Sequence, residues 1–317
     1  MYDSVPRVCV GIPVYNGEDY LREALDSLLA QTYGDFEVVV SDNASTDSTE
    51  RICRAYAARD PRIRYTRTGC NIGAGPNFNR VFGFCRSPYF KWMPYDDTLA
   101  PEWLARTVAL LDGDSRAVLA HTAVRMVDEE GLPLEVRADG KVIDRRGKDL
   151  LLVEPLHLAE GACPADRFRD VLRRMTWCVA GLGLIRAEAL RRTHLHGDFY
   201  GGDSVAVAEL ALLGRFRQSE EPLFLKRCHG TISVHKTWRE RARWINPTGP
   251  AGLPWLRMRM AYLRALTVTD LSLSQRLSCL GTVARVSARN PLLYRLLPFG
   301  LRSLPVVGDW LRERAQE

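Results

Sequence analysis

The sequence of 317 residues lacks features that would each fix a class of protein. It has no run of about eighteen consecutive apolar residues, the length that a helix needs to cross a bilayer. The start Met1–Ser4 lacks the charged and apolar regions of a signal peptide. Its eight cysteines include no C-x-x-C pair and no zinc-finger spacing. We therefore expect a cytosolic protein with reduced, mostly buried thiols.

A glycine triplet is also missing where a dinucleotide-binding fold would need one. The apolar run over 7–14 leads into Pro13-Val14-Tyr15-Asn16-Gly17 rather than into G-x-G-x-x-G, so the sequence offers no glycine loop for a pyrophosphate. This absence excludes the usual dinucleotide-binding fold. A diphosphate bound by this chain would need another counter-ion.

What is present is an alternation of strand and helix patterns typical of an α/β fold. Short apolar runs predict the strands, and leucines at helical spacing predict the first helix. The expected strands cover 7–14, 36–40, 63–66, 89–93 and 223–226. The expected helices cover 18–31, 47–59, capped by Ser45 or Asp47, and 77–85. At this spacing we expect a mostly parallel central sheet with flanking helices, joined by right-handed crossovers.

Polar residues follow four of these strands. Tyr15, Asp42, Asn71 and Asp96 each come shortly after a predicted strand or at its end. Because ligands of such sheets bind beyond the carboxyl ends of the strands, we expect the four residues to converge on one edge.

The adjacent carboxylates of Asp96 and Asp97 are the most informative pair. Neighbouring like charges raise each other's pKa and oppose folding, and a hard divalent ion such as Mg²⁺ or Mn²⁺ relieves this by oxygen ligation. The alternative is a helix start, with Asp97 or Thr98 as the N-cap of a helix that contains Pro101.

With these residues placed, the chain resembles the inverting glycosyltransferases of family 2, which have the GT-A fold. The resemblance covers roughly 5–230, and its motifs are V-G-I-P-V-Y-N, S-D-N-A-S-T-D, N-I-G and Y-D-D-T-L-A-P-E-W-L. It implies a nucleotide-diphospho-sugar donor, a divalent cation, Mg²⁺ or Mn²⁺, and inversion at the anomeric carbon by a single displacement.

The resemblance also implies which residues bind the donor. The ring of Tyr15 would stack on a pyrimidine, and Asp42 with Asn43 would read the base edge. The family more often has two aspartates at 42–43, but an asparagine carbonyl still accepts from the N3–H of uracil or thymine, which favours UDP or dTDP. The donor-binding residues expected from the resemblance are Pro13, Tyr15, Asn16, Asp42, Asn43, Asn71, Gly73 and Asp96.

By the same resemblance, Asp97 would ligate the metal, while Asp96 would hold the donor ribose or a metal-bound water. Many relatives have D-x-D-D where this chain has Pro-Tyr-Asp-Asp, so the assignment within the pair stays open and both are candidate ligands. His229 and His235 would contact the diphosphate or complete the metal shell. The alternative for either histidine is an ordinary core or surface role.

Asp203, in Gly-Gly-Asp-Ser before an apolar helix, matches the position of the family's general base. Inversion needs one carboxylate within reach of the acceptor hydroxyl. The alternative is an N-cap aspartate. Trp177, Arg186 and Tyr200 are candidates to line the acceptor site, with core packing the alternative for Trp177.

The C-terminal third is basic. From Lys226 onward the chain has 16 Lys and Arg against 5 Asp and Glu, a net charge of +11 within a total of +6. Segment 240–244 is close to the Q-x-x-R-W motif of processive synthases, but without membrane spans a single addition is the better interpretation. We expect peripheral attachment to an anionic membrane or a lipid phosphate. The alternative is helices that pack on the catalytic domain or a dimer partner.

We therefore expect a nucleotide-sugar-binding half over 1–112, an acceptor-binding half with the base over 113–228 and a helical C-terminal extension over 229–317. The predicted function is metal-dependent, inverting sugar transfer to a hydroxyl in bacterial glycan, glycolipid or secondary-metabolite biosynthesis, without nucleic acid. Two alternatives remain. A sugar-nucleotidyltransferase would need a glycine-rich phosphate loop and a lysine near the first helix, and the sequence has neither. A non-catalytic sugar-nucleotide-binding protein would account for Asn43 and for the absence of the first aspartate of D-x-D-D.

Overall fold

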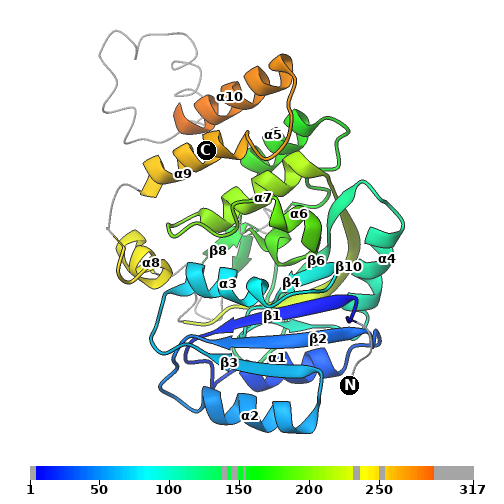
Figure 1. Ribbon diagram of the computed structural model, residues 1–317, viewed down its shortest axis with the longest axis vertical. Coiled ribbons are helices and arrows are strands. Elements are labelled where there is room, and N and C mark those ends of the chain that lie inside the picture. Colours follow the sequence, from blue (N-terminus) through cyan, green and yellow to red (C-terminus); the bar gives the residue numbers. More distant parts are fainter. Residues whose placement is uncertain are drawn as a thin grey trace.

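A computed structural model describes residues 5–137, 141–143, 149–152, 155–176, 178–230, 236–249 and 254–288. The helices and strands alternate as expected for an α/β fold (Figure 1). The strands are β1 (Val8–Val14), β2 (Phe36–Asp42), β3 (Ile63–Arg67), β4 (Tyr89–Trp92), β5 (Thr98–Leu99), β6 (Ala117–Val127), β7 (Lys141–Ile143), β8 (Asp149–Leu152), β9 (Leu184–Arg186) and β10 (Arg215–Arg227). The helices are α1 (Leu21–Leu29), α2 (Thr49–Arg59), α3 (Ala74–Gly83), α4 (Trp103–Asp112), α5 (Pro164–Arg174), the 3₁₀ helix η1 (Val179–Leu182), α6 (Ala187–Arg191), α7 (Gly202–Leu213), α8 (Trp238–Ile245), α9 (Pro254–Ala265) and α10 (Leu273–Ala288).

The central sheet has the strand order β3-β2-β1-β4-β9-β6-β10-β5. Its first four strands in this order are parallel, with β1 paired to β2 from Val8↔Phe36 to Val14↔Asp42. Strand β9 runs antiparallel to both of its neighbours, and β10 is parallel to β6. The carboxyl ends of β1 to β4, β6 and β10 therefore lie at one edge, which is the mostly parallel arrangement that the sequence predicts.

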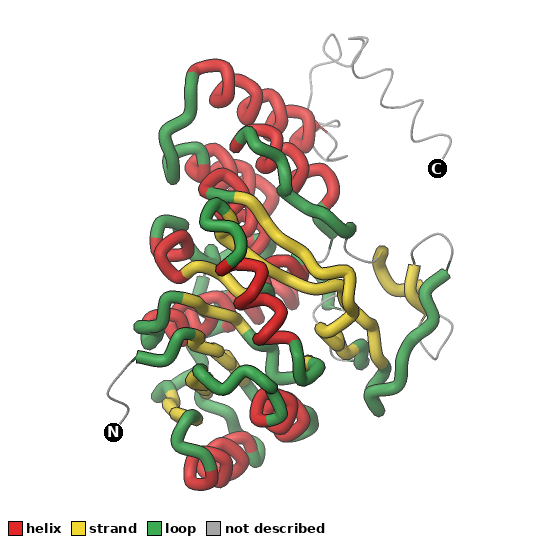
Figure 2. The backbone as a smooth tube through the Cα atoms, turned by 90° about the vertical axis from the view of Figure 1, so that its right-hand side faces the viewer, coloured by secondary structure: helices red, strands yellow, loops and turns green. Residues whose placement is uncertain are grey.

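Apolar side chains form a core on each face of this sheet. One cluster joins the sheet to α1, α2 and α4 through residues such as Leu25, Ile52 and Leu104. The other joins it to α3, α5 and α7 through residues such as Phe82 and Phe168. Strand β1 is buried along its whole length, as expected for a strand covered by helices on both faces. Figure 2 shows these layers from the side.

Two expected boundaries are wrong, and so is the alternative in which the acidic pair starts a helix. Helix α3 begins at Ala74 rather than at Asn77, because Gly73 takes a φ of 91° and serves as its N-cap. The last strand is much longer than 223–226, since β10 starts at Arg215. Neither Asp97 nor Thr98 caps a helix: Thr98 belongs to β5, and the next helix has Glu102 as its N-cap.

The C-terminal helices pack on the domain. Helix α9 contacts α7, and α10 contacts α5 and α9, with Tyr262, Leu266, Cys279 and Val283 buried against them. Of the helices described, none has the length and apolar character needed to cross a membrane. All eight cysteines carry reduced thiols and most are buried, as predicted.

Candidate donor and catalytic site

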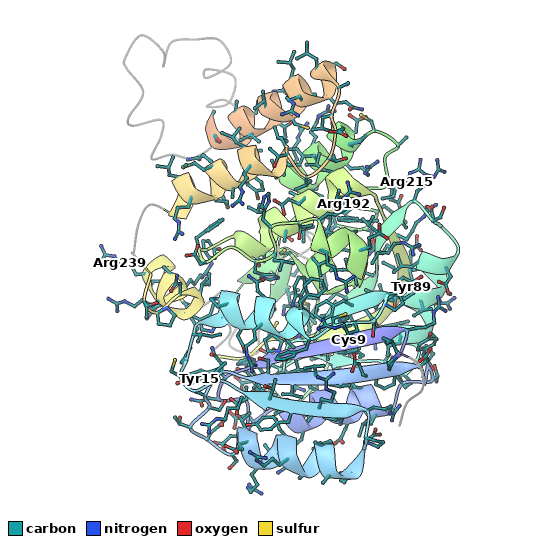
Figure 3. The ribbon with its side chains drawn as sticks, in the orientation of Figure 1. Cys9, Tyr15, Tyr89, Arg192, Arg215 and Arg239 are labelled. Atoms are coloured by element: carbon teal, nitrogen blue, oxygen red, sulfur yellow. The ribbon has the colours of Figure 1, made fainter. Side chains whose placement is uncertain are left out.

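The polar residues predicted to converge do lie at one edge of the sheet. Tyr15 follows β1, Asp42 ends β2, Asn71 follows β3 and Asp96 follows β4. His229 joins them, because β10 is parallel to β6 and ends two residues earlier at Arg227. Figure 3 shows Tyr15 on the same side of the molecule as α8 with Arg239, whereas Tyr89, at the start of β4, lies on the opposite side.

Asp96 and His229 form a close pair at this edge. The Nε2 atom of His229 lies 3.0 Å from Oδ2 of Asp96, and the Asp96 side chain is 19% exposed while His229 is buried. Burial alone would raise the pKa of Asp96, but the hydrogen bond from His229 and the charge of Lys226 hold it below its usual range. The ring of Tyr20 packs 4.9 Å from the His229 ring. His229 is therefore positioned by both groups.

Asp97 has different surroundings from its neighbour. It is fully buried, its Oδ1 accepts the backbone N–H of Arg227 at 2.9 Å, and its Oδ2 lies 3.3 Å from Nζ of Lys226. Burial raises its pKa to about 6. Both of its oxygens face the end of β10, so Asp97 holds this strand against the turn after β4.

Arg227 contacts the turn that carries the pair, and no sequence motif singles it out. Its Nε donates to the carbonyl oxygen of Asp96 at 3.1 Å, and its Nη1 donates to the carbonyl oxygen of Glu129 at 2.6 Å. Its Nη2 pairs with Glu23 of α1, and the guanidinium lies over the ring of Tyr20. One buried arginine thus joins the Asp96 turn to α1 and to the loop after β6.

Lys91 is a second buried cation behind the aspartates. It lies on β4 with no exposed surface, donates to the carbonyl oxygen of Leu182, and lies over the rings of Trp103 and Phe224. Burial lowers its pKa to about 7. A lone lysine in an apolar strand gave no signal that sequence reasoning could use.

The predicted base-reading residues are already engaged with the protein. Asp42 is fully buried; its Oδ2 accepts from the Tyr65 hydroxyl at 2.7 Å and its Oδ1 from the Ser45 N–H at 2.8 Å. Asn43 donates to Oδ1 of Asn71 at 2.9 Å and accepts from the N–H of Ile72 at 2.9 Å. Asn43 therefore ties the end of β2 to the loop after β3.

Tyr15 and Asn16 occupy the loop after β1, beyond the buried Pro13. Tyr15 is 37% exposed, as a ring that stacks on a base requires. Asn16 has a φ of 52°, and its Oδ1 accepts from the N–H of Thr46 at 2.9 Å. Asn16 thereby links this loop to the one after β2.

Asp203 is the second residue of α7 and not its N-cap, which is Gly201 in the left-handed conformation. Its Oδ1 accepts from the adjacent N–H of Ser204 at 2.8 Å. The preceding loop approaches closely, since a Cβ on Gly202 would lie 2.6 Å from the backbone N of Gly197. The capping alternative for Asp203 is therefore wrong.

Two polar contacts hold the loop before α7. The amide of Asn79 exchanges hydrogen bonds with the backbone N–H and carbonyl of His196, and the buried Glu209 accepts from the backbone N–H of His194 at 2.7 Å. The His196 ring packs on Phe78 and Trp92, and burial lowers its pKa to about 4, so the ring is neutral at pH 7. Asp203 thus follows a firmly held loop.

Helix α8 contacts both sides of the site. A Cβ on Gly73 would lie 2.3 Å from the carbonyl oxygen of Ile245, the last residue of α8. On the other side, Nη1 of Arg241 donates to the Tyr200 hydroxyl at 2.5 Å. The helix therefore connects the loop after β3, which contains Gly73, with the loop that leads to Asp203.

Arg186 does not line an acceptor site. Its Nε donates to the carbonyl oxygen of Ala117 at 2.7 Å and its Nη2 to that of Leu111 at 2.7 Å. It pairs with Tyr89 at the start of β4, the end of the sheet opposite the site. Trp177 and His235 lie outside the described residues.

The sheet, the acidic pair at its carboxyl edge and the absence of a glycine triplet in the sequence define a protein with the fold of GT-A glycosyltransferases. Residues 9–159 match the profile named Glycosyl transferase family 2. This segment, just under half of the chain, therefore resembles members of glycosyl transferase family 2.

Relatives in sequence agree with this assignment. An uncharacterized glycosyltransferase of Rickettsia prowazekii is 30% identical over 159 residues, which are 50% of this chain and 49% of the relative. One from Rickettsia felis is 36% identical over 52% of this chain and 28% of its own length. Chondroitin synthase of Escherichia coli is 34% identical over 40% of this chain and 18% of its own length. The chain thus spans about half or less of these relatives.

Solved structures share the fold. Residues 1–349 of S. aureus TarS in complex with UDP-GlcNAc superpose with a TM-score of 0.64 at 16% identity, covering 95% of this chain and 78% of that one. The mannosyltransferase PcManGT from Pyrobaculum calidifontis, in complex with GDP-Man and Mn²⁺, gives a TM-score of 0.51 at 18% identity over 99% of this chain and 81% of that one.

Proposed function

We propose that this protein transfers a sugar from a nucleotide-diphospho-sugar to an acceptor hydroxyl, with inversion in a single displacement. The observation that carries the proposal is the pair of Asp96 and His229, 3.0 Å apart, at the sheet edge where Tyr15 and Asp42 also lie. Ligands of parallel α/β sheets bind at this edge. The family match over residues 9–159 supports sugar transfer as the reaction.

The residues at the edge fit a divalent cation such as Mg²⁺ or Mn²⁺. The described residues contain no group of three or more metal-binding side chains, but such a cation often takes only one or two protein ligands together with substrate phosphates. Asp96 and His229 would supply a carboxylate and an imidazole. The cation would neutralise charge on the departing diphosphate.

The two aspartates would then differ in role, with Asp96 rather than Asp97 as the metal ligand. Asp97 was the expected ligand, but both of its oxygens face Lys226 and the Arg227 backbone. We assign ligation to Asp96 and a positioning role to Asp97. This assignment follows from the contacts of the pair, because the Asp97 oxygens would have to leave Lys226 and the Arg227 backbone to reach a bound cation, whereas the Asp96 side chain is partly exposed.

UDP is the favoured donor nucleotide, with dTDP as the second choice. The exposed ring of Tyr15 offers a stacking surface for a base. Asp42 is fully buried and already contacts Tyr65, Ser45 and Arg67, so it would hold the loops around the base while Tyr15 makes the contact. Asn43 keeps a different role from the expected one, because its amide holds the loop at Asn71 and Gly73. That S. aureus TarS was solved with UDP-GlcNAc supports UDP by analogy of fold alone.

Asp203 would act as the general base. It would accept the acceptor proton as the hydroxyl oxygen attacks the anomeric carbon and the bond to the nucleotide diphosphate breaks. Its carboxylate accepts from the backbone N–H and the hydroxyl of the adjacent Ser204, and the residue is exposed at the start of α7.

The acceptor is a hydroxyl compound that we propose receives one sugar, in bacterial glycan, glycolipid or secondary-metabolite biosynthesis. The transfer reaction would take place in the cytoplasm. Nucleic acid is not a proposed substrate, and the protein would act as a monomer or as a homodimer. Tyr200, bonded to Arg241 beside the loop before α7, remains a candidate to contact the acceptor.

A donor assay tests the proposal. The protein is incubated with a panel of UDP-sugars and Mn²⁺, and the products are separated. Release of UDP supports transfer, whereas pyrophosphate release from UTP with a sugar phosphate would support a nucleotidyltransferase instead. UDP binding by calorimetry without turnover on any acceptor would indicate a non-catalytic binding protein. Full activity in EDTA would overturn the metal assignment.

A further inference from the structure

Helix α9 carries an exposed apolar stripe on the face opposite its packed one. Leu256, Met260 and Leu263 are 42%, 61% and 46% exposed and follow the spacing i, i+4, i+7, which places them on one side of a helix. Tyr262 and Leu266 are buried against the domain. At 100° per residue the stripe therefore points away from the domain.

Helix α10 repeats this arrangement. Leu273, Leu277 and Leu280 are 74%, 59% and 39% exposed at the same spacing, while Cys279 and Val283 are buried. Because α9 and α10 contact each other, the two stripes belong to one end of the molecule, far from β1 to β3 (Figures 1 and 2). We call them the leucine stripes. Soluble proteins rarely expose so many large apolar side chains together without a partner.

The helices that carry the leucine stripes are strongly basic. Residues 254–288 contain five arginines and a single acidic residue, Asp270. Arg257 pairs with Asp198 and Arg259 donates to the carbonyl oxygen of Ser287. The other three arginines, Arg264, Arg276 and Arg285, are exposed. Apolar stripes flanked by exposed arginines are the composition of a helix that lies in a membrane interface.

Charge decides between the surfaces that could cover the stripes. A second copy of the chain would bring the same excess of arginine to the contact. Residues 289–317 of this chain contain five arginines against three acidic residues, so this segment would also add positive charge to positive charge. An anionic lipid surface complements both the leucines and the arginines.

We propose that the leucine stripes of α9 and α10 insert into the interface of an anionic membrane, with both helices lying along the surface and not across it. The proposal goes beyond the proposed function, because it concerns the surface of α9 and α10 and not the carboxyl edge of the sheet where Tyr15 and Asp96 lie. It defines which residues of the basic C-terminal third attach the protein to a membrane.

Flotation with lipid vesicles tests this proposal on the full chain. We expect the protein to float with vesicles of phosphatidylcholine and phosphatidylglycerol at low salt, and to float much less with phosphatidylcholine alone. Replacing Leu273, Leu277 and Leu280 by serine should lower the partition coefficient at least about tenfold. Replacing Arg276 and Arg285 by glutamine should lower it roughly fivefold per arginine at low salt, and less at high salt.

The matched control is Leu132→Ser with Leu156→Ser, because both leucines are exposed but lie outside α9 and α10. These substitutions should leave flotation unchanged, and every variant should bind UDP as the wild type does. Hydrogen exchange gives a second readout, since anionic vesicles should slow exchange in α9 and α10 selectively. Failure of the wild type to float at low salt would overturn the proposal, whether or not sugar transfer is found. A mass twice that of the monomer that falls to monomer in the stripe variant, without any flotation, would assign the stripes to a second copy.

Discussion

Arg227 shows how much of the site depends on one buried side chain. It is 2% exposed and donates to the Asp96 and Glu129 carbonyls while pairing with Glu23. Arg227→Lys keeps the charge but loses the planar fork that reaches these partners. We expect a loss of about 1–3 kcal/mol in the free energy of unfolding, since buried carbonyl groups lose their hydrogen-bond donor, measured by urea denaturation, together with weaker UDP binding in Mn²⁺. The control is Arg285→Lys, because Arg285 is exposed. Equal stability and affinity in both variants would contradict this role.

His121 predicts a pH dependence of stability. It is buried on β6, its Nε2 has no hydrogen-bond partner, and burial lowers its pKa from 6.5 to about 4. The unfolded chain binds a proton on this ring at a pH where the folded chain does not. The stability that the neutral ring contributes is therefore complete above pH 6.5 and is lost as the pH falls toward 4.

His121→Leu should remove this dependence. We expect the free energy of unfolding of the variant, relative to the wild type, to rise by up to about 3 kcal/mol as the pH falls through this window. Urea denaturation at a series of pH values measures it. A difference between the two proteins that does not change with pH would show that His121 does not titrate in this way.

At the level of single residues, the sequence predicted where the polar groups gather but not which atoms are engaged. Tyr15, Asp42, Asn71 and Asp96 follow strands, so the edge was predictable. The separate roles of Asp96 and Asp97 depend on Lys226, Arg227 and His229 from β10 and the loop after it. Contacts between segments so far apart in the chain are set by tertiary packing, which no local pattern encodes.

At the level of elements, the contact of α8 with the donor loop carries a prediction. Gly73 has a φ of 91°, and a Cβ there would lie 2.3 Å from the carbonyl oxygen of Ile245. Gly73→Ala should displace α8 or the loop, lower the free energy of unfolding by about 1–3 kcal/mol and weaken UDP binding, measured by calorimetry. Gly69→Ala is the control, because a Cβ at Gly69 meets nothing within 4 Å. Unchanged affinity in Gly73→Ala would mean that the contact does not shape the donor site.

The accuracy of the predicted elements follows their burial. Strands β1 and β2 are buried nearly throughout, so their apolar runs marked them clearly. Strand β10 was recognised only over 223–226, because its first half contains the polar stretch Gln218–Glu221 and its pairing with β6 shifts register between Ser219 and Phe224. Helix α3 begins early because Gly73 takes a φ of 91°, which favours glycine, and the neighbouring residues in the sequence do not indicate this conformation.

For the whole molecule, the order of elements fixed the fold class, since strands that alternate with helices at this spacing form a parallel sheet. Two features needed the structure. The antiparallel strand β9 lies between β4 and β6, although it has only three residues and no distinguishing pattern. The helices α9 and α10 pack on α7 and α5 and still expose the leucine stripes, so the packing and membrane interpretations of this region describe different faces of the same helices.

The most direct test of the account as a whole compares UDP binding and turnover in Asp203→Asn. Calorimetry with UDP and Mn²⁺ reports the donor site, and UDP release from a UDP-sugar reports transfer, with the acceptor chosen from a panel of glycans, lipid phosphates and small molecules. Asp270→Asn is the control, because Asp270 is exposed and lies between α9 and α10. We predict that Asp203→Asn binds UDP as the wild type does, while its turnover falls by about 10²–10⁴, the contribution of a general base. Turnover at the wild-type rate in this variant would contradict the assignment of Asp203 as the base.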